Sequence, residues 1–267
     1  MAVRGRAAQL DYKVVGEGPP LLLVMGMSGT YDHWDERFVG ELARHRRVIL
    51  YDHRGVGRSA PLEGPFTIAD LAGDALGLVE RLGLERVDLL GFSMGGMIAQ
   101  EVAINDPQRV GRLVLAATFA GGRNSLPTPR ETAERLGGAL QSGNRELALR
   151  TAWELNISAA RLADEELWQR FLAIGRRRVV PLAVIQRQLE AILRFDAYDR
   201  LPEISAPTLV IHGTEDRMLP VGNGEILAGR IPGARLAKLE GVGHLFFWEE
   251  PQRSAQLVLD HLRKGGG

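Results

Sequence analysis

The sequence predicts an α/β fold, a mostly parallel, doubly wound sheet with an inserted helical cap. Short, continuous apolar runs recur along the chain and alternate with amphipathic stretches, as buried parallel strands and their crossover helices do. Between residues 123 and 201 the strand-like runs nearly vanish and segments rich in Ala, Leu, Arg and Glu replace them. This stretch of about eighty residues is too long for a loop in a compact domain. We therefore expect residues 1–122 and 202–264 to form the core and residues 123–201 to form the cap.

The predicted strands are short apolar runs, and the first strand-like segment differs from the others. Residues 9–15 alternate between apolar and polar, which favours an antiparallel edge hairpin that turns through residues 16–20. The remaining runs are expected to be buried parallel strands. They are Leu21–Met25, Val48–Tyr51, Val87–Leu90, Leu113–Ala116, Leu209–Ile211 and, more weakly, Leu236–Leu239.

Helix starts are marked by capping residues. Thr67 and Asp70 fit an N-cap pair, and a helix is predicted from there to about Leu82. A closing helix is predicted to begin at Pro251, because proline suits the first helical position and two glutamates precede it near the positive end of the helix dipole. The cap is expected to hold helices over Arg130–Ser142, Arg145–Asn156, Glu165–Gly175 and Pro181–Phe195.

The segment from Gly91 to Gly95 fits the Gly-x-Ser-x-Gly nucleophile elbow. It lies between the apolar run Val87–Leu90 and a helix-like segment over residues 96–103. In such an elbow a strand turns abruptly into a helix, and glycines on both sides relieve the crowding around the serine. Ser93 is therefore a candidate nucleophile. A serine hydroxyl is weak near neutral pH, so this interpretation requires a histidine to accept its proton and an acid to orient that histidine.

Both groups are found downstream. The run Leu209–Ile211 is followed by Glu215 and Asp216, which places two acids at the carboxyl end of a strand, where sites form in open parallel sheets. His244 lies in a glycine-flanked loop after the last predicted strand. Either acid could serve, and the match to the motif favours Asp216. The order Ser93, Asp216, His244 is the Ser, acid, His order of one class of serine hydrolases.

These motifs, together with the segment over residues 51–59 (Tyr-Asp-His-Arg-Gly-Val-Gly-Arg-Ser), resemble those of the α/β-hydrolase fold superfamily over nearly the whole chain. The resemblance is closest to capped serine esterases, enol-lactone hydrolases and cofactor-free perhydrolases. It implies a Ser-His-Asp triad that forms an acyl-enzyme from a small to medium, mostly apolar ester. It also implies an oxyanion hole formed by the backbone N–H groups of Met94 and Met27. A ligand receptor that retains the fold without turnover is the alternative from another class.

The chain departs from this pattern before the second oxyanion donor, where the usual His-Gly is Met25-Gly26. The loop thus lacks the hydrogen bonds that the histidine gives in relatives. Methionine side chains fill irregular space and tolerate varied apolar shapes, so we expect a permissive apolar pocket. Its predicted lining residues are Met25, Gly26, Phe92, Met97, Met218, Leu245 and Phe246.

Composition limits the remaining possibilities. Lys plus Arg and Asp plus Glu number 33 each, so no global charge attracts nucleic acid or anionic lipid, and a small-molecule ester or lactone is the expected partner. There is no cysteine, no metal-ligand spacing and no phosphate-cradling glycine motif, so no metal, nucleotide or flavin is expected. The first residues lack an apolar segment of signal-peptide length and no later run could span a membrane, so the protein is expected to be cytoplasmic.

Several other residues are given structural interpretations. His33, His45 and His261 are expected at the surface, and Arg176–Arg178 at a solvated helix end, although these arginines could guide an anionic substrate. The four tryptophans are expected to pack in the interior, with Trp153 or Trp168 the candidates for a substrate contact.

Overall fold

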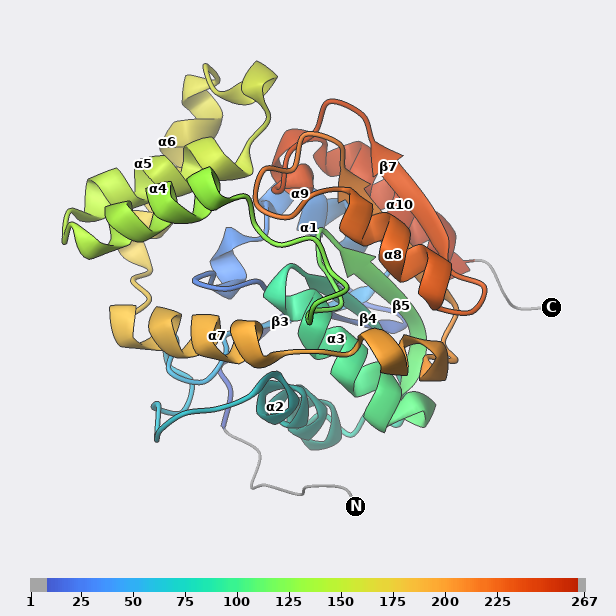
Figure 1. Cartoon of the computed structure of the whole chain (residues 1–267). Coiled ribbons are helices and arrows are strands. Elements are labelled where there is room, and N and C mark those ends of the chain that lie inside the picture. Colours follow the sequence, from blue (N-terminus) through green and yellow to red (C-terminus); the bar gives the residue numbers. More distant parts are fainter. Residues whose placement is uncertain (1–8, 264–267) are drawn as a thin grey trace.

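The computed structural model describes residues 9–263, and the predictions made for residues 1–8 and for the end of the chain from residue 264 lie outside this range. In the described part, seven strands form one sheet in the order β1-β3-β2-β4-β5-β6-β7, flanked by helices on both faces (Figure 1). The strands are β1 (Tyr12–Val15), β2 (Pro20–Val24), β3 (Arg47–Tyr51), β4 (Val87–Phe92), β5 (Val110–Ala116), β6 (Thr208–Gly213) and β7 (Arg235–Leu239).

The sheet is parallel except at β1, which pairs antiparallel with β3. The prediction that the first strand forms a hairpin with the next one is therefore wrong, although its antiparallel edge position is correct. Strand β2 lies between β3 and β4, where its side chains are buried on both faces of the sheet. Such a central place suits the continuous apolar run of β2, whereas in β1 three successive residues, Tyr12, Lys13 and Val14, are exposed, as an edge position allows.

Two apolar layers cover the sheet. On one face, Leu22 and Val24 of β2 pack with α2 (Ile68–Arg81) and α3 (Met94–Asn105). On the other face, Leu21 and Leu23 pack with α1 (Glu36–Ala43) and α10 (Pro251–Arg263). Consecutive side chains of a strand point to opposite faces, so a single apolar run contributes to both layers. No helix within residues 9–263 combines the length and the apolar character needed to cross a membrane.

Helices with clear end signals were predicted well. Thr67 caps α2, its hydroxyl accepts the Asp70 N–H, and the Asp70 carboxylate accepts the Thr67 N–H at 2.7 Å. Pro251 is the first residue of α10. Helices α1 and α8 (Gly222–Arg230) were not predicted, although Asp35 caps α1 by accepting the N–H groups of Arg37 and Phe38. Helix α8 has three glycines in nine residues, and glycine is a poor helix former, so its helicity depends on packing against β6 and β7.

The cap is defined here as the four helices α4 (Arg130–Gln141), α5 (Arg145–Asn156), α6 (Glu165–Arg177) and α7 (Leu182–Arg194). Each begins within one residue of its predicted start. Helices α4 to α6 lie together beside the core, and α7 runs back along the core above α2 (Figure 1). Trp153 and Trp168 are buried in an aromatic cluster with Phe171, so they hold the cap together.

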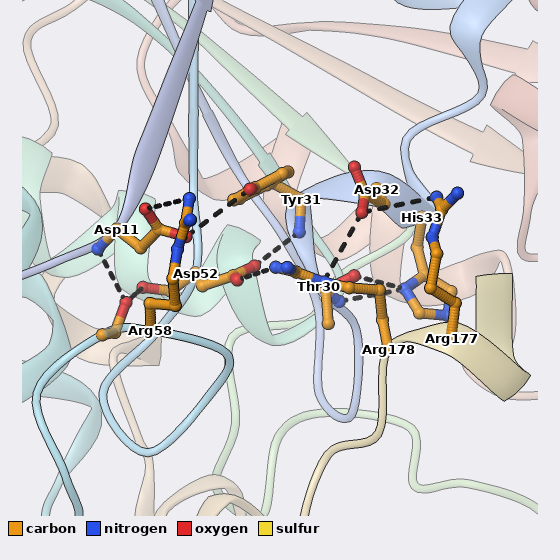
Figure 2. A network of polar contacts seen from close by, with 10 residues as sticks. Asp11, Thr30, Tyr31, Asp32, His33, Asp52, Arg58, Arg177 and Arg178 are labelled. Carbon is orange, nitrogen blue, oxygen red and sulfur yellow. Dashed lines mark hydrogen bonds and ion pairs between the residues drawn. The ribbon is translucent and has the colours of Figure 1, made fainter.

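Arg178, at the end of α6, joins the cap to the core and is not solvated as predicted. Its guanidinium forms an ion pair with the buried carboxylate of Asp52. Arg178 Nε also lies 3.5 Å from Asp32 Oδ2, and Arg178 Cζ lies over the Tyr31 ring, 4.7 Å from the ring centroid. The Asp52 carboxylate also accepts the Tyr31 N–H at 2.7 Å. Figure 2 shows this network, which extends to Asp11 near the start of the sheet. A paired, stacked arginine of this kind anchors the cap and is not free to guide substrates.

His261 on α10 is also buried, contrary to the surface position predicted for it. Its Nε2 lies 3.1 Å from the Pro207 carbonyl oxygen, and Arg235 donates to its Nδ1 at 3.3 Å. Burial, together with the nearby positive charges of Arg112 and Arg235, lowers the pKa of His261 to about 4. The ring is therefore neutral in the folded protein at pH values where an exposed histidine is charged.

This burial predicts a loss of stability in mild acid. Between the unfolded pKa of about 6.5 and the folded pKa of about 4, the unfolded chain binds more protons at residue 261 than the folded one, so the free energy of unfolding falls as the pH drops through this window. Urea unfolding at pH 7 and pH 5 measures the loss. His261→Gln should show a smaller loss than the wild type; an equal loss would contradict the prediction.

Candidate active site

Ser93 lies at the junction of β4 and α3 in a left-handed backbone conformation, with φ 55° and ψ −121°. Such a conformation is strained for a residue other than glycine. Two glycines make the turn possible, because a Cβ at Gly91 would overlap the Gly95 carbonyl and a Cβ at Gly95 would overlap the Val24 carbonyl. Hydrogen bonds fix the serine backbone, since its N–H donates to Ala116 O at 2.9 Å and its carbonyl accepts from the Thr118 hydroxyl at 2.7 Å.

Asp216 and His244 form a buried pair. His244 Nδ1 lies 2.7 Å from Asp216 Oδ2, and the N–H groups of Met218 and Leu219 each donate to Asp216 Oδ1 at 2.8 Å. Burial alone would raise the pKa of Asp216, but the charge of His244 and the hydrogen bonds from His212 and His244 outweigh it and lower this pKa. The carboxylate thus stays ionised, as needed to orient an imidazole.

His212 is a second imidazole on the same acid. Its Nε2 lies 2.9 Å from Leu219 O and 3.2 Å from Asp216 Oδ2, and a proton on this nitrogen serves both acceptors. The Glu215 carboxylate instead accepts the Ala159 N–H at 3.2 Å. Of the two acids considered from the sequence, Asp216 is therefore the one bonded to His244.

Ser93 and His244 line a common cavity of about 150 Å³, called here the inner cavity. The His244 ring packs against Phe92 with centroids 4.8 Å apart. The two side chains do not hydrogen bond to each other in this structure, and such contacts often tighten only in the complex with substrate. Apart from Ser93 and His244, the lining contains no Asp, Glu, Lys or Arg and is mostly apolar. It comprises Met25, Gly26, Met27, Ser28, Gly29, His33, Phe92, Leu136, Leu149, Ala152, Asn156, Phe171, Met218, Leu245 and Trp248.

Most predicted pocket residues lie in this lining, but Met97 and Phe246 do not. Met97 lies one helical turn after Ser93 on the face of α3 that packs into the core. Phe246 is fully buried in the other core layer, where it packs edge-on against Phe38 and Phe247. Both predictions were wrong because a position close to a site residue in the sequence does not determine whether the side chain faces the cavity or the core. Of the tryptophans, Trp248 lines the cavity, not Trp153 or Trp168.

The two predicted oxyanion donors have no protein acceptor among the described residues. Met94 is the first residue of α3, and Met27 lies in the loop after β2. Next to Met27, Ser28 has a positive φ of 60°. Its N–H donates to the Gln188 side-chain oxygen at 2.9 Å, and His53 Nε2 lies 2.9 Å from Met25 O. These contacts hold the backbone on either side of Gly26 and Met27.

Gln188 belongs to α7 of the cap and is fully buried. The loop beside Ser93 is thus held by a residue 160 positions away along the chain. One sequence signal points to Gln188, namely that it is a polar residue on the apolar face of an amphipathic helix. That signal does not identify the partner.

The loop that carries His244 is also bonded to the cap. Buried Glu249 accepts the Gly243 N–H at 2.8 Å and the Ser158 N–H at 3.0 Å, and it accepts from the Ser158 hydroxyl as well. The Leu245 N–H donates to Asn156 O at 2.9 Å. Burial raises the pKa of Glu249. Residues on either side of His244 are therefore fixed to the last residue of α5 and to the segment that follows it.

A second, larger space of about 380 Å³ opens beside the inner cavity and is called here the outer chamber. The two share Met27, Ser28, His33, Leu136, Leu149 and Ala152. Two arginines border the outer chamber, and both have partners: Arg145 donates to Arg176 O at 3.1 Å and to Gly175 O, and Arg178 pairs with Asp52. The outer chamber is otherwise lined mainly by aliphatic side chains of the cap.

Comparison with known proteins agrees with this geometry. The family described as alpha/beta hydrolase fold matches residues 19–251. The chain belongs to this family. It is 31% identical over 261 residues to the putative carbamate hydrolase RutD of Azorhizobium caulinodans, covering 96% of this chain and 95% of that protein. It is 34% identical over 268 residues to 2-hydroxy-6-oxononadienedioate/2-hydroxy-6-oxononatrienedioate hydrolase 2 of Pseudomonas putida, covering 96% and 92%.

Among solved structures, the enol-lactonase from Burkholderia xenovorans LB400 is similar with a TM-score of 0.82 and 29% identity, over 96% of each chain. The family and these relatives make the protein an α/β-hydrolase enzyme. The relatives act on different bonds according to their names, so the substrate of this member has to be argued from its own cavity.

The contacts of Glu249 predict a large effect on stability. Glu249→Leu should lower the free energy of unfolding by roughly 3 kcal/mol or more, because it leaves the buried Ser158 and Gly243 donors without an acceptor. Glu249→Gln, which retains one oxygen acceptor, should cost less. Urea unfolding measures both. Glu240→Leu, at an exposed position, is the control, and a Glu249→Leu protein as stable as this control would contradict the assignment.

Proposed function

We propose that the protein is a serine carboxylic ester hydrolase that acts on a small to medium, mostly apolar ester. One observation carries this proposal: Ser93, strained at its elbow, shares an apolar cavity with an imidazole that is bonded to a buried, ionised carboxylate. This arrangement supplies a nucleophile, a base and an orienting acid.

In the proposed mechanism, His244 takes the proton of Ser93 as Oγ attacks the ester carbonyl. Asp216 orients the ring and stabilises the imidazolium through Nδ1. The C–O bond to the alcohol then breaks, and His244 gives its proton to the departing alkoxide, which leaves an acyl-enzyme. Water, deprotonated by His244, attacks the acyl-enzyme and releases the acid and Ser93.

The tetrahedral intermediates carry a negative oxygen that needs donors already in place. The free N–H groups of Met27 and Met94 are proposed to fill this role. Gln188 supports the first of them, because its bond to Ser28 fixes the backbone immediately after Met27. The cap therefore contributes to the proposed oxyanion hole through backbone geometry and not through direct contact with the substrate.

The lining of the inner cavity favours an uncharged substrate. None of its described residues is Lys or Arg, and a carboxylate buried without a cationic partner is strongly disfavoured. The dienedioate and trienedioate named for the Pseudomonas putida relative carry two such groups. A neutral ester fits this cavity better than a dicarboxylate does.

An enol-lactone hydrolase, a carbamate hydrolase or a perhydrolase could use the same groups. The lactone and carbamate carbonyls would be attacked by Ser93 as an ester is, and a perhydrolase differs in using hydrogen peroxide in place of water in the second step. The similarity to the enol-lactonase structure and to the putative carbamate hydrolase keeps these substrates in the test.

The first test compares matched substrates. Wild type should hydrolyse p-nitrophenyl butanoate and should be at least about tenfold less efficient, in kcat/KM, on mono-p-nitrophenyl succinate, because the added carboxylate finds no cation in the cavity. A lactone, a carbamate and added peroxide complete the panel. Preference for the succinate would contradict the proposed substrate class.

Ser93→Ala should lower kcat by roughly 10⁴-fold or more while the protein remains folded. A Ser93→Ala protein that retains wild-type activity would contradict the assigned nucleophile. A wild type that binds esters without hydrolysing any member of the panel would instead indicate the receptor alternative.

The second test addresses the oxyanion loop. Gln188→Met, which is similar in size but offers no acceptor to Ser28, should lower kcat on p-nitrophenyl butanoate by about 10-fold to 100-fold with little change in KM, because loss of a whole oxyanion donor costs about 10²–10³. Affinity for a boronic acid inhibitor should fall in parallel. Gln186→Met, at an exposed position of the same helix, is the control. A change in KM alone would contradict this role.

A further inference from the structure

His33 lies where the inner cavity and the outer chamber meet, although it was predicted to lie at the surface. It is the last residue of the short 3-10 helix Tyr31–His33, which follows the loop of Met27. It is one of the six residues that line both spaces. A ligand that extends from Ser93 into the outer chamber would therefore have His33 among the residues around it.

The hydrogen bonds of the ring determine which nitrogen carries the proton. The backbone N–H of Thr30 donates to His33 Nδ1 at 3.0 Å, and the Thr30 hydroxyl lies at the same distance from this nitrogen; Figure 2 shows both contacts. A backbone amide can only donate, so Nδ1 must carry a lone pair. The proton of the neutral ring is therefore on Nε2.

The ring is also held in position. Phe171 packs against it edge-on, with centroids 5.8 Å apart and an interplanar angle of 70°. The His33 carbonyl accepts from the Trp248 indole at 2.8 Å. Phe171 and Trp248 themselves line the inner cavity. His33 is thus a preorganised part of the cavity wall.

Nε2–H has no protein acceptor among the described residues, and Nε2 is not among the unpartnered atoms that protein encloses completely, so a ligand can reach it. Burial lowers the pKa of His33 to about 4, so the ring is a neutral donor at neutral pH. An unsatisfied donor in a site of low polarity gains from any acceptor that a ligand brings. A single neutral N–H does not compensate a buried carboxylate, so an uncharged oxygen is its best partner.

We propose that His33 determines substrate specificity by donating its Nε2–H to an uncharged oxygen of the substrate, such as an ether, ketone or hydroxyl oxygen, located beyond the scissile carbonyl. This inference rests on the proposed ester hydrolase function and narrows its substrate class. The preferred esters are then apolar at most positions and carry one acceptor at the distance where the inner cavity meets the outer chamber.

The test uses p-nitrophenyl hexanoate and three esters in which an ether oxygen replaces methylene 3, 4 or 5 of the acyl chain. Acetates of hexanol and of the corresponding ether alcohols probe the alcohol side in the same way. The quantity measured is the ratio of kcat/KM for each ether ester to that for its alkyl counterpart. Comparison of this ratio between protein variants removes the intrinsic reactivity of each ester.

His33→Asn and His33→Gln form the matched pair of variants. The shorter asparagine can place an oxygen near the former Nδ1 and keep the Thr30 bond, but it does not reach the position of Nε2. Glutamine can place an N–H there. For at least one ether position, the ratio should be about fivefold to tenfold higher in wild type than in His33→Asn, as expected for one neutral hydrogen bond, and His33→Gln should recover part of it.

Ratios that are equal in wild type and His33→Asn at every position would overturn this inference while leaving the ester hydrolase intact. Loss of selectivity without recovery in His33→Gln, combined with a lower unfolding temperature of His33→Asn, would also overturn it, because the ring would then act only as packing. A wild type that hydrolyses none of these esters would refute the proposed function itself.

Discussion

Around Ser93 three stretches of backbone approach one another so closely that side chains cannot lie between them. The end of β2 touches the first turn of α3 at Gly95, and the same turn touches β4 at Gly91. The left-handed conformation of Ser93 is compatible with this packing because its own N–H and carbonyl are bonded to the segment at the end of β5. This turn fixes the position of Ser93, and the other groups of the site lie around that position.

The sheet and the places of Ser93, Asp216 and His244 in the fold could be predicted because they depend on local patterns. Apolar runs mark the strands, and the elbow needs its glycines within two residues of Ser93. Of the helices that were missed, α8 owes its helicity to its neighbours and not to its residues, whereas α1 does have a local mark, the capping residue Asp35. The hairpin was predicted wrongly because alternation identifies an edge strand without identifying the strand that it pairs with.

Residues that complete the site escaped prediction for a related reason. His33 and Gln188 gain their importance from partners, Thr30 in one case and Ser28 in the other, and from a cavity assembled by distant segments. Nothing in the sequence around Gln188 indicates a loop 160 residues earlier. Arg178 was likewise predicted to belong to a solvated basic run, but it pairs with Asp52, which lies in a motif loop of the core. Long-range polar contacts of this kind leave no periodic signal.

The cap is bonded to both loops on which the proposed chemistry depends, through Gln188 on one side and through Ser158 and Asn156 on the other. Exchange of the cap between relatives, as a route to a new specificity, would therefore have to preserve these bonds. A transplanted cap would have to carry an amide acceptor and a serine at positions equivalent to Gln188 and Ser158. Without them, the loops of Met27 and His244 would lose the bonds that hold them in place. Gradual change of the lining side chains, with these anchors retained, is the route that the architecture leaves open.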